Sequence, residues 1–290
     1  MAKRQMQMRP QWAREKQPDP PDFGKAKRIP RWLLNFMVWR RRLKTKGIIL
    51  KSDSVCNFEK GLVSLVVLSC KRFAEFRRLC KSMKTFFNQI ENYTGIEKIL
   101  ADNGSGLELV NYAKGLNLFD IIIAHPVNLG MAGALNDAYQ RCRGEYIMLI
   151  EDDMVMEYDK PFVQRCMDIF TEFPEIGIIR LKNQNNWWKP FRIIGPLRST
   201  STGVEFWTWL PSFNGQNNVW ACGSVLFRKV SFFSTGLLPS GQGRNQAYVV
   251  ENLYGKGYNK TWLAAKVKNC YPVVQPNDNP ESPGFEDKLI

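Results

Sequence analysis

An α/β fold with a mainly parallel sheet covered by helices is predicted for residues 61–275. Short apolar runs alternate with amphipathic segments from residue 62 to residue 181, and polar or glycine-rich residues follow several of the apolar runs. Strands that alternate with helices need crossover connections, which produce parallel strands buried on both faces. With 290 residues, 44% of them hydrophobic, the chain is long enough to enclose such a core.

The elements follow from these runs in chain order. The apolar runs are expected to form strands over 62–69, 96–101, 120–125, 145–150 and 176–181. The amphipathic segments between them are expected to form helices over 73–90, 107–116, 134–143 and 161–173. Asp159 is the expected cap of the last helix, with Pro161 in its first turn. Beyond residue 182 we expect irregular structure over 183–218, a strand over 219–228, a helix over 247–257 and a C-terminal tail over 276–290.

The formal net charge of +14 belongs to one end of the chain. Residues 1–51 hold 15 Lys and Arg against 3 Asp and Glu, a net charge of +12, whereas residues 52–290 hold 26 against 24, a net charge of +2. The pooled charge therefore describes a basic N-terminal arm, residues 1–50, and not the body of the protein.

The arm contains one apolar stretch, WLLNFMVW at 32–39, followed directly by arginines and lysines. Its eight residues are too few for a bilayer span, which needs roughly 20. Three interpretations stay open. Residues 29–46 form an interfacial helix that contacts anionic lipid, or an amphipathic helix docked on the body, or a contact with nucleic acid.

The cysteines, the histidine and the N-terminal residues indicate the cellular compartment in which the protein is expected. The seven cysteines are scattered without a CxxC pair, which indicates reduced thiols and neither a disulfide framework nor a zinc site. The single histidine, His125, closes an apolar run and is expected to be a strand-end residue. The first 28 residues are polar and contain prolines, which is not typical of a secretory signal. We expect a cytoplasmic protein, with peripheral membrane contact as an option.

Polar residues follow four of the predicted strands, and in a parallel sheet such carboxyl ends form the ligand-binding edge. They are Ser69–Arg72, Asp102–Gly106, Pro126–Gly130 and Glu151–Asp153. If Asp159 caps the next helix, the three adjacent carboxylates of Glu151–Asp153 are not needed as helix caps. Adjacent carboxylates at a strand end are a usual way to bind Mg²⁺ or Mn²⁺, which take one or two protein oxygens and complete their shell with water and phosphate.

A nucleotide would have to bind without either common glycine motif. No GxxxxGK[ST] loop occurs, and the first strand runs into SCKRF without the glycines of a dinucleotide fingerprint. A nucleotide held through a metal–diphosphate bridge, with Asp102 on its base or ribose, fits the pattern.

The segments VVLSCKR, ILADNGSG and NLGMAGALNDAYQRCRGEYIMLIEDDM, in this order, resemble the GT-A glycosyltransferases, particularly the family 2 type. The resemblance covers residues 63–155 well and continues weakly to about residue 270. It implies a GT-A (Rossmann-like) sheet and transfer of a sugar from a nucleotide-diphosphate sugar to an acceptor hydroxyl, with Mn²⁺ or Mg²⁺ as cofactor. The acceptor stays open among a glycan, a lipid-linked sugar and a nucleic acid.

The resemblance also implies roles for individual residues. Asp153 would bind the metal with Glu151, and Asp102 would contact the nucleotide base or ribose. The remaining donor-binding residues would be Ser69, Lys71, Arg72, Asn128, Gly130 and Asp152. Asn136 would shape the loop beside the nucleotide. Aromatic rings stack on sugars, so the acceptor side is assigned to Trp207, Trp209 and Trp220, which share that duty with covering the sheet.

The chain departs from the family pattern where an inverting enzyme carries its catalytic base. Asn245 and Gln246 stand where the family has a Glu-Asp pair, and no histidine follows His125 to serve as the family's late metal ligand. Glu251 is the first candidate for the base and Glu205 the second. Two other functions stay open: a sugar nucleotidyltransferase, and a non-catalytic glycan- or nucleotide-binding module whose arm binds nucleic acid or membrane.

Overall fold

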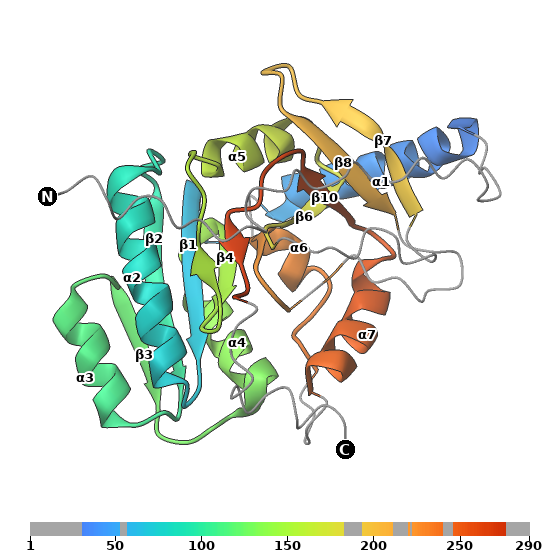
Figure 1. Ribbon diagram of the computed structural model, residues 1–290. Coiled ribbons are helices and arrows are strands. Elements are labelled where there is room, and N and C mark those ends of the chain that lie inside the picture. Colours follow the sequence, from blue (N-terminus) through green and yellow to red (C-terminus); the bar gives the residue numbers. More distant parts are fainter. Residues whose placement is uncertain are drawn as a thin grey trace, which may run out of the picture.

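The computed structural model describes residues 31–52, 57–182, 193–210, 220, 222–239 and 246–276. One large sheet runs through the molecule, with helices on both faces (Figure 1). The strands are β1 (Glu59–Ser69), β2 (Ile96–Asn103), β3 (Ile121–His125), β4 (Gly144–Glu151), β5 (Val155–Met156), β6 (Ile176–Arg180), β7 (Ile193–Ser199), β8 (Glu205–Leu210), β9 (Val225–Arg228), β10 (Leu263–Val267) and β11 (Val273–Val274). The helices are α1 (Arg31–Ser52), α2 (Phe73–Gln89), α3 (Leu107–Leu116), α4 (Gly130–Arg141), α5 (Val163–Glu172), α6 (Lys229–Phe233) and α7 (Gln246–Tyr258).

The strand order of the main sheet is β3-β2-β1-β4-β9-β6-β10-β8-β7. The first four strands in this order run parallel, and β10 runs parallel to β6. The other neighbouring strands are antiparallel: β9 pairs with β4 and β6, and β8 pairs with β10 and β7. A small second sheet pairs β5 with β11. The α/β class with a mainly parallel, helix-covered sheet is therefore confirmed.

The two faces of the sheet enclose two hydrophobic clusters. Along β1, Val63, Leu65 and Val67 contribute to the cluster under α2, α3 and α5, whereas Val66 contributes to the cluster under α4, α6 and α7. This alternation is the period of two that an extended strand imposes on its side chains. Both sides of β1 are apolar because both faces of the sheet are covered.

Two strands, β7 and β8, lie where the sequence indicated irregular structure, so that expectation is wrong for residues 193–199 and 205–210. In β8, Phe206 and Leu210 pack on one face while Trp207 and Trp209 pack on the other. In a strand buried on both faces, apolar and polar residues do not alternate. That alternation is the usual sign of a strand in a sequence. The predicted strand over 219–228 is also shorter, because β9 begins only at Val225.

The predicted start of α5 is wrong as well. The helix begins at Val163, and neither Asp159 nor Pro161 is part of it. The backbone N–H groups of Phe162 and Val163 instead donate to Oε2 of Glu91, at 2.9 and 3.3 Å. A carboxylate from the loop after α2 therefore serves the free amides that begin the helix.

Six of the seven cysteines, all except Cys56, fall in the described part of the chain, and each is a free thiol. None of the described helices is long and apolar enough to cross a membrane. Residues 1–30 and 277–290, which include most of the basic arm and of the C-terminal tail, lie outside the described residues.

Candidate functional site

The carboxyl ends of β1, β2, β3 and β4 lie side by side at one edge of the sheet. In the parallel pairing of β1, Ser69 is opposite Asp102 of β2, and Leu68 is opposite Glu151 of β4. Asn103 of β2 is in turn opposite His125, the last residue of β3. The register therefore brings together the four polar segments that the sequence places after these strands.

Asp152 is the most enclosed member of the acidic cluster Glu151–Asp153, with 4% of its surface exposed. Its Oδ2 accepts hydrogen bonds from Ser69 Oγ at 3.0 Å and from the Cys70 backbone N–H at 3.3 Å. Arg72 Nη1 lies 3.3 Å from Asp152 Oδ1 and 3.3 Å from Asp153 Oδ2. One guanidinium thus bridges two carboxylates of the cluster.

These carboxylates are unusually hard to ionise together. Burial, with the charge of Asp153, raises the pKa of Glu151 to about 7 despite nearby Lys182. Burial also raises the pKa of Asp152 to about 6, although Arg72 and the Ser69 hydroxyl act in the opposite sense. A shift of two units corresponds to roughly 3 kcal/mol against the ionised form. Burial, with a smaller contribution from charge repulsion, therefore disfavours the ionised carboxylates, and a bound cation would offset that cost.

The residues present fit a hard divalent cation. Oδ1 of Asp153 is buried and has no hydrogen-bond partner among the described residues. Its other oxygen, Oδ2, accepts from Gln275 Nε2 at 3.1 Å as well as facing Arg72. No three His, Cys, Asp or Glu side chains of the described residues surround a common metal position. Mg²⁺ commonly binds through one or two carboxylates plus water and phosphate oxygens, which matches the ligands on offer.

Beside the acids, the loop after β2 is held against the loop after β3 by asparagine side chains. Asn103 Nδ2 donates to Asn128 Oδ1 at 2.9 Å, and Asn103 Oδ1 accepts from the Leu129 N–H at 2.8 Å. Asn128 Oδ1 also accepts from the Gly130 N–H at 2.7 Å, at the start of α4. Asn103 was not predicted as a site residue from the sequence, although it follows Asp102 in the DNGSG segment.

Asp102, near the end of β2, is buried. Its two carboxylate oxygens accept from the Ser105 backbone N–H at 3.3 and 3.2 Å. Ser105 Oγ in turn accepts from the backbone N–H of Lys71, a residue in the left-handed region at φ 58°. Ser105 therefore connects the turn after β1 to Asp102 at the end of β2.

Gly104 allows these two loops to approach. Its φ is +78°, and a Cβ there would lie 2.7 Å from the backbone N of Asn128 and 2.8 Å from the carbonyl carbon of Val127. We expect Gly104→Ala to lower the free energy of unfolding by at least about 2 kcal/mol, because backbone strain and a backbone clash combine. Gly203→Ala is the matched control, since Gly203 has φ +84° and open space around its Cβ position. Urea unfolding that gives both variants equal losses would contradict the clash.

The other predicted residues lie on α4, α7 and β8, or just before β9. The Asn136 side chain donates to the carbonyl of Leu238 and accepts from its N–H, each at 2.9 Å. Glu251 lies in the middle of α7. Trp207, Trp209 and Trp220 are buried, with exposed fractions of 8%, 5% and 1%. Trp220 packs edge-on against Phe227 and Tyr254, so its ring is part of the core.

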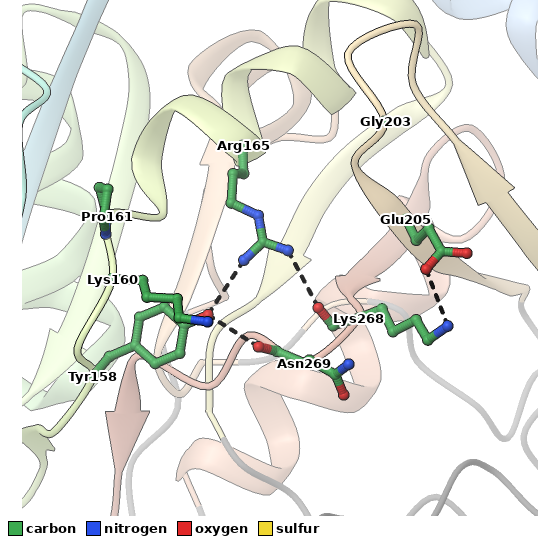
Figure 2. Close-up of a pocket in the computed structure, with 8 residues that line it drawn as sticks. All are labelled: Tyr158, Lys160, Pro161, Arg165, Gly203, Glu205, Lys268 and Asn269. Carbon is green, nitrogen blue, oxygen red and sulfur yellow. Dashed lines mark hydrogen bonds and ion pairs between the residues drawn. The ribbon is translucent and has the colours of Figure 1, made fainter.

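Glu205 lines a separate pocket of about 470 Å³ (Figure 2). Its carboxylate pairs with Lys268 Nζ at 3.0 Å, and Arg165 lies across the pocket, donating to the Tyr158 hydroxyl and the Lys268 carbonyl. The lining residues are Tyr158, Lys160, Pro161, Arg165, Gly203, Glu205, Lys268 and Asn269. None of them belongs to the acidic cluster or to the loops around Asp102.

Gln275 is a site residue that the sequence did not reveal. Its side chain donates to Asp153 and accepts from Lys182 Nζ at 2.5 Å. The strand β11, just before it, pairs with β5, which follows the acidic cluster directly. Gln275 lies 122 residues from Asp153 in the chain, and the pairing of β11 with β5 brings the two side chains together.

The sheet order, the crossover helices and the polar edge at β1, β2 and β4 define a GT-A fold. The chain belongs to glycosyl transferase family 2, whose family model matches residues 64–230. Among solved structures, S. aureus TarS is similar with a TM-score of 0.53 and 13% identity, over 73% of this chain and 36% of that one.

A structure of TarS residues 1–349 with UDP-GlcNAc also has a TM-score of 0.53 and 13% identity, over 76% of this chain and 60% of that one. The chain therefore spans less than two thirds of the TarS chains that it resembles. No curated protein matches it.

Proposed function

We propose that this protein transfers a sugar from a nucleotide-diphosphate sugar to an acceptor hydroxyl with the help of Mn²⁺ or Mg²⁺. The observation that carries the proposal is the acidic cluster at the end of β4, where a buried carboxylate oxygen of Asp153 has no partner among the described residues. Asp102 lies at the end of β2, on the other side of β1. Membership of family 2 supports the same reaction class.

The role of each residue is assigned from its position at the edge of the sheet. Asp153, with Glu151, would hold the metal, whose charge would stabilise the departing diphosphate. Asp102 would accept hydrogen bonds from the base or ribose of the donor. Lys71 and Arg72, at the adjoining end of β1, would lie beside the diphosphate with Ser69. Asp152 would touch the ribose or orient the metal's waters. Asn128 and Gly130 would shape the neighbouring wall: Asn128 Oδ1 accepts from both Asn103 Nδ2 and the Gly130 N–H. The protein mainly positions reactants and stabilises charge.

An inverting reaction needs a carboxylate that takes the proton of the acceptor hydroxyl. Glu251 on α7 is our first candidate and Glu205 our second. Glu205 lines the pocket of Figure 2, where Lys268 Nζ lies 3.0 Å from its carboxylate. The acceptor side would include the region of Trp207, Trp209 and Trp220, with the indole rings acting as packed walls.

A thermal-shift screen tests the donor and the metal. The wild-type protein is mixed with UDP, GDP and UDP-GlcNAc, the ligand of the similar TarS structure, each with and without Mn²⁺. A saturating donor is expected to raise Tm by about 5 °C or more, and only when Mn²⁺ is present. A shift of equal size without metal would contradict the metal bridge. No shift with any nucleotide would contradict the proposal as a whole.

Glu251→Gln and Glu205→Gln distinguish the two candidates for the base. Loss of the base is expected to lower kcat by about 10²- to 10⁴-fold while the donor-induced rise in Tm persists, since the base acts on the acceptor. The other variant serves as the matched control and is expected to keep kcat within about threefold. Full donor binding without measurable transfer in the wild-type protein would favour the non-catalytic binding module.

A further inference from the structure

The helix α1 has one face docked on the body of the protein. Arg41 Nη2 donates to the Asn259 carbonyl at 3.0 Å, and Arg42 Nη2 donates to the Glu172 carbonyl at 3.0 Å. Between these contacts and the end of the helix, Thr45 is fully buried, and Ile48 and Ile49 pack against the hydrophobic cluster under α4 and α6. The docking contacts determine how the whole helix is rotated about its axis.

The opposite face of α1 exposes large apolar side chains. Phe36, Trp39, Leu43 and Leu50 are exposed by 47%, 54%, 54% and 73%. At 3.6 residues per turn, these four positions fall within an arc of about 60° of the helix circumference. They form one strip along the helix, which we call the outer strip. Phe36 and Trp39 are stacked within it, with ring centroids 5.9 Å apart.

Cations border the outer strip. Arg40, Lys44 and Lys51 are exposed and lie together along one side of it, and Lys46 is exposed on the other side. Arg40 reaches over the Phe36 ring at 6.0 Å. Residues 31–52 contain no Asp or Glu, and residues 1–30 add 8 Lys and Arg against 3 Asp and Glu. The exposed face is therefore apolar along its centre and positively charged along its borders.

We propose that the outer strip of α1 binds the surface of an anionic lipid bilayer, with the helix lying in the plane of the membrane. An interfacial helix buries an apolar face among the acyl chains and directs its cations to the lipid headgroups. Trp39 and Phe36 suit that depth, because aromatic rings are favoured at the membrane interface. None of the described helices can span a bilayer, and α1 is held to the body along its other face.

Other partners use only part of this surface. Nucleic acid would contact the cations through its phosphates but would leave four large apolar side chains in water. A second copy could cover the apolar side chains, but it would bring two helices rich in cations and without carboxylates against each other. A bilayer containing anionic lipid accommodates both the apolar strip and its charged borders.

The position of α1 leaves the site edge free. In Figure 1, α1 lies at the side of the molecule that carries β7 and β8, opposite to α3. The acidic cluster follows β4, in the middle of the sheet order. Membrane binding through the outer strip is therefore separable from donor binding, and its test does not depend on the proposed reaction.

Vesicle co-sedimentation of the full-length protein tests the proposal. The vesicles are phosphatidylcholine alone, and phosphatidylcholine mixed with phosphatidylglycerol. We expect binding to the mixed vesicles that weakens as salt is raised. Leu43→Ser and Trp39→Ser are each expected to lower the partition coefficient by about five- to tenfold, since each loses part of a buried apolar side chain. Lys44→Gln should lower it by about fivefold on the mixed vesicles only.

Leu107→Ser is the matched control, because Leu107 is a leucine with 78% exposure at the start of α3 on the other side of the molecule. Its partition coefficient should equal that of the wild type. Two variants of the outer strip are used, so that the test still holds if one of them does not fold. Folding of each variant is checked by its Tm. Equal vesicle binding by wild type and both strip variants, or no binding at all, would overturn the proposal. So would a dimer in sedimentation equilibrium that Leu43→Ser abolishes, or duplex DNA bound more tightly than vesicles.

Discussion

Asp153→Asn is expected to lower sugar transfer by at least about 100-fold, the effect that loss of one charge-stabilising group commonly has. The variant keeps the size of the side chain but loses the charge that would attract a divalent cation to Oδ1, which has no hydrogen-bond partner in the described part of the chain. We therefore expect the Mn²⁺-dependent rise in Tm with donor to disappear as well. Steady-state kinetics and the thermal-shift titration, each performed over a range of Mn²⁺ concentrations, measure the two effects.

The same substitution should not unfold the protein. The charge of Asp153 raises the pKa of both Glu151 and Asp152, so its removal relieves repulsion in the metal-free state. We expect the Tm without metal to stay within a few degrees of the wild-type value. Glu157→Gln is the control, because Glu157 is an exposed carboxylate shortly after the cluster. Wild-type activity and Mn²⁺ response in Asp153→Asn would show that the metal is held elsewhere.

Trp220→Ala is expected to lower the free energy of unfolding by about 3–5 kcal/mol, the usual cost of removing a large buried aromatic side chain. Trp220 is 1% exposed and contacts the rings of Phe227, Phe232, Tyr254 and Tyr258. Collapse of these four rings into the space left by Trp220 would disturb both β9 and α7. Urea unfolding monitored by circular dichroism measures the change.

This substitution also tests the assignment of Trp220 to the acceptor side. Trp220→Phe keeps an aromatic ring in the cluster and is expected to recover at least half of the lost stability. Leu253→Ala, at a side chain with 56% exposure, is expected to change stability by no more than about 0.5 kcal/mol. A stable Trp220→Ala protein with an increased KM for the acceptor would instead mean that the ring contacts the substrate.

Much of the site edge follows from the local sequence. The parallel strands β1, β2, β3 and β4 were predictable because each is a short apolar run between amphipathic helices, and their parallel order brings the polar ends to one edge. Asp102 and the Glu151–Asp153 cluster stand directly after such runs. Asn103 was within reach of the same reasoning, since it is adjacent to Asp102, but its role as a bridge to Asn128 depends on the neighbouring loop.

The second half of the sheet was less predictable. β7 and β8 form a hairpin whose inner strand is apolar on both faces, and β10 is a run of five buried residues inserted between β6 and β8. Short runs of this kind do not distinguish a strand from a buried piece of helix. The start of α5 was misplaced because its cap is Glu91, about 70 residues earlier in the chain.

The sequence by itself determined the α/β class, the sugar-transferase family and the acids at the end of β4, because these depend on residues close together in the chain. Only the tertiary structure decided which side chains meet across long separations: Gln275 with Asp153, and Glu205 with Lys268. It also decided the orientation of α1. Apolar residues occur on both faces of that helix, so its sequence does not distinguish the docked face from the exposed one. Contacts with Glu172 and Asn259 turn Ile48 and Ile49 inward and leave Phe36, Trp39, Leu43 and Leu50 facing solvent.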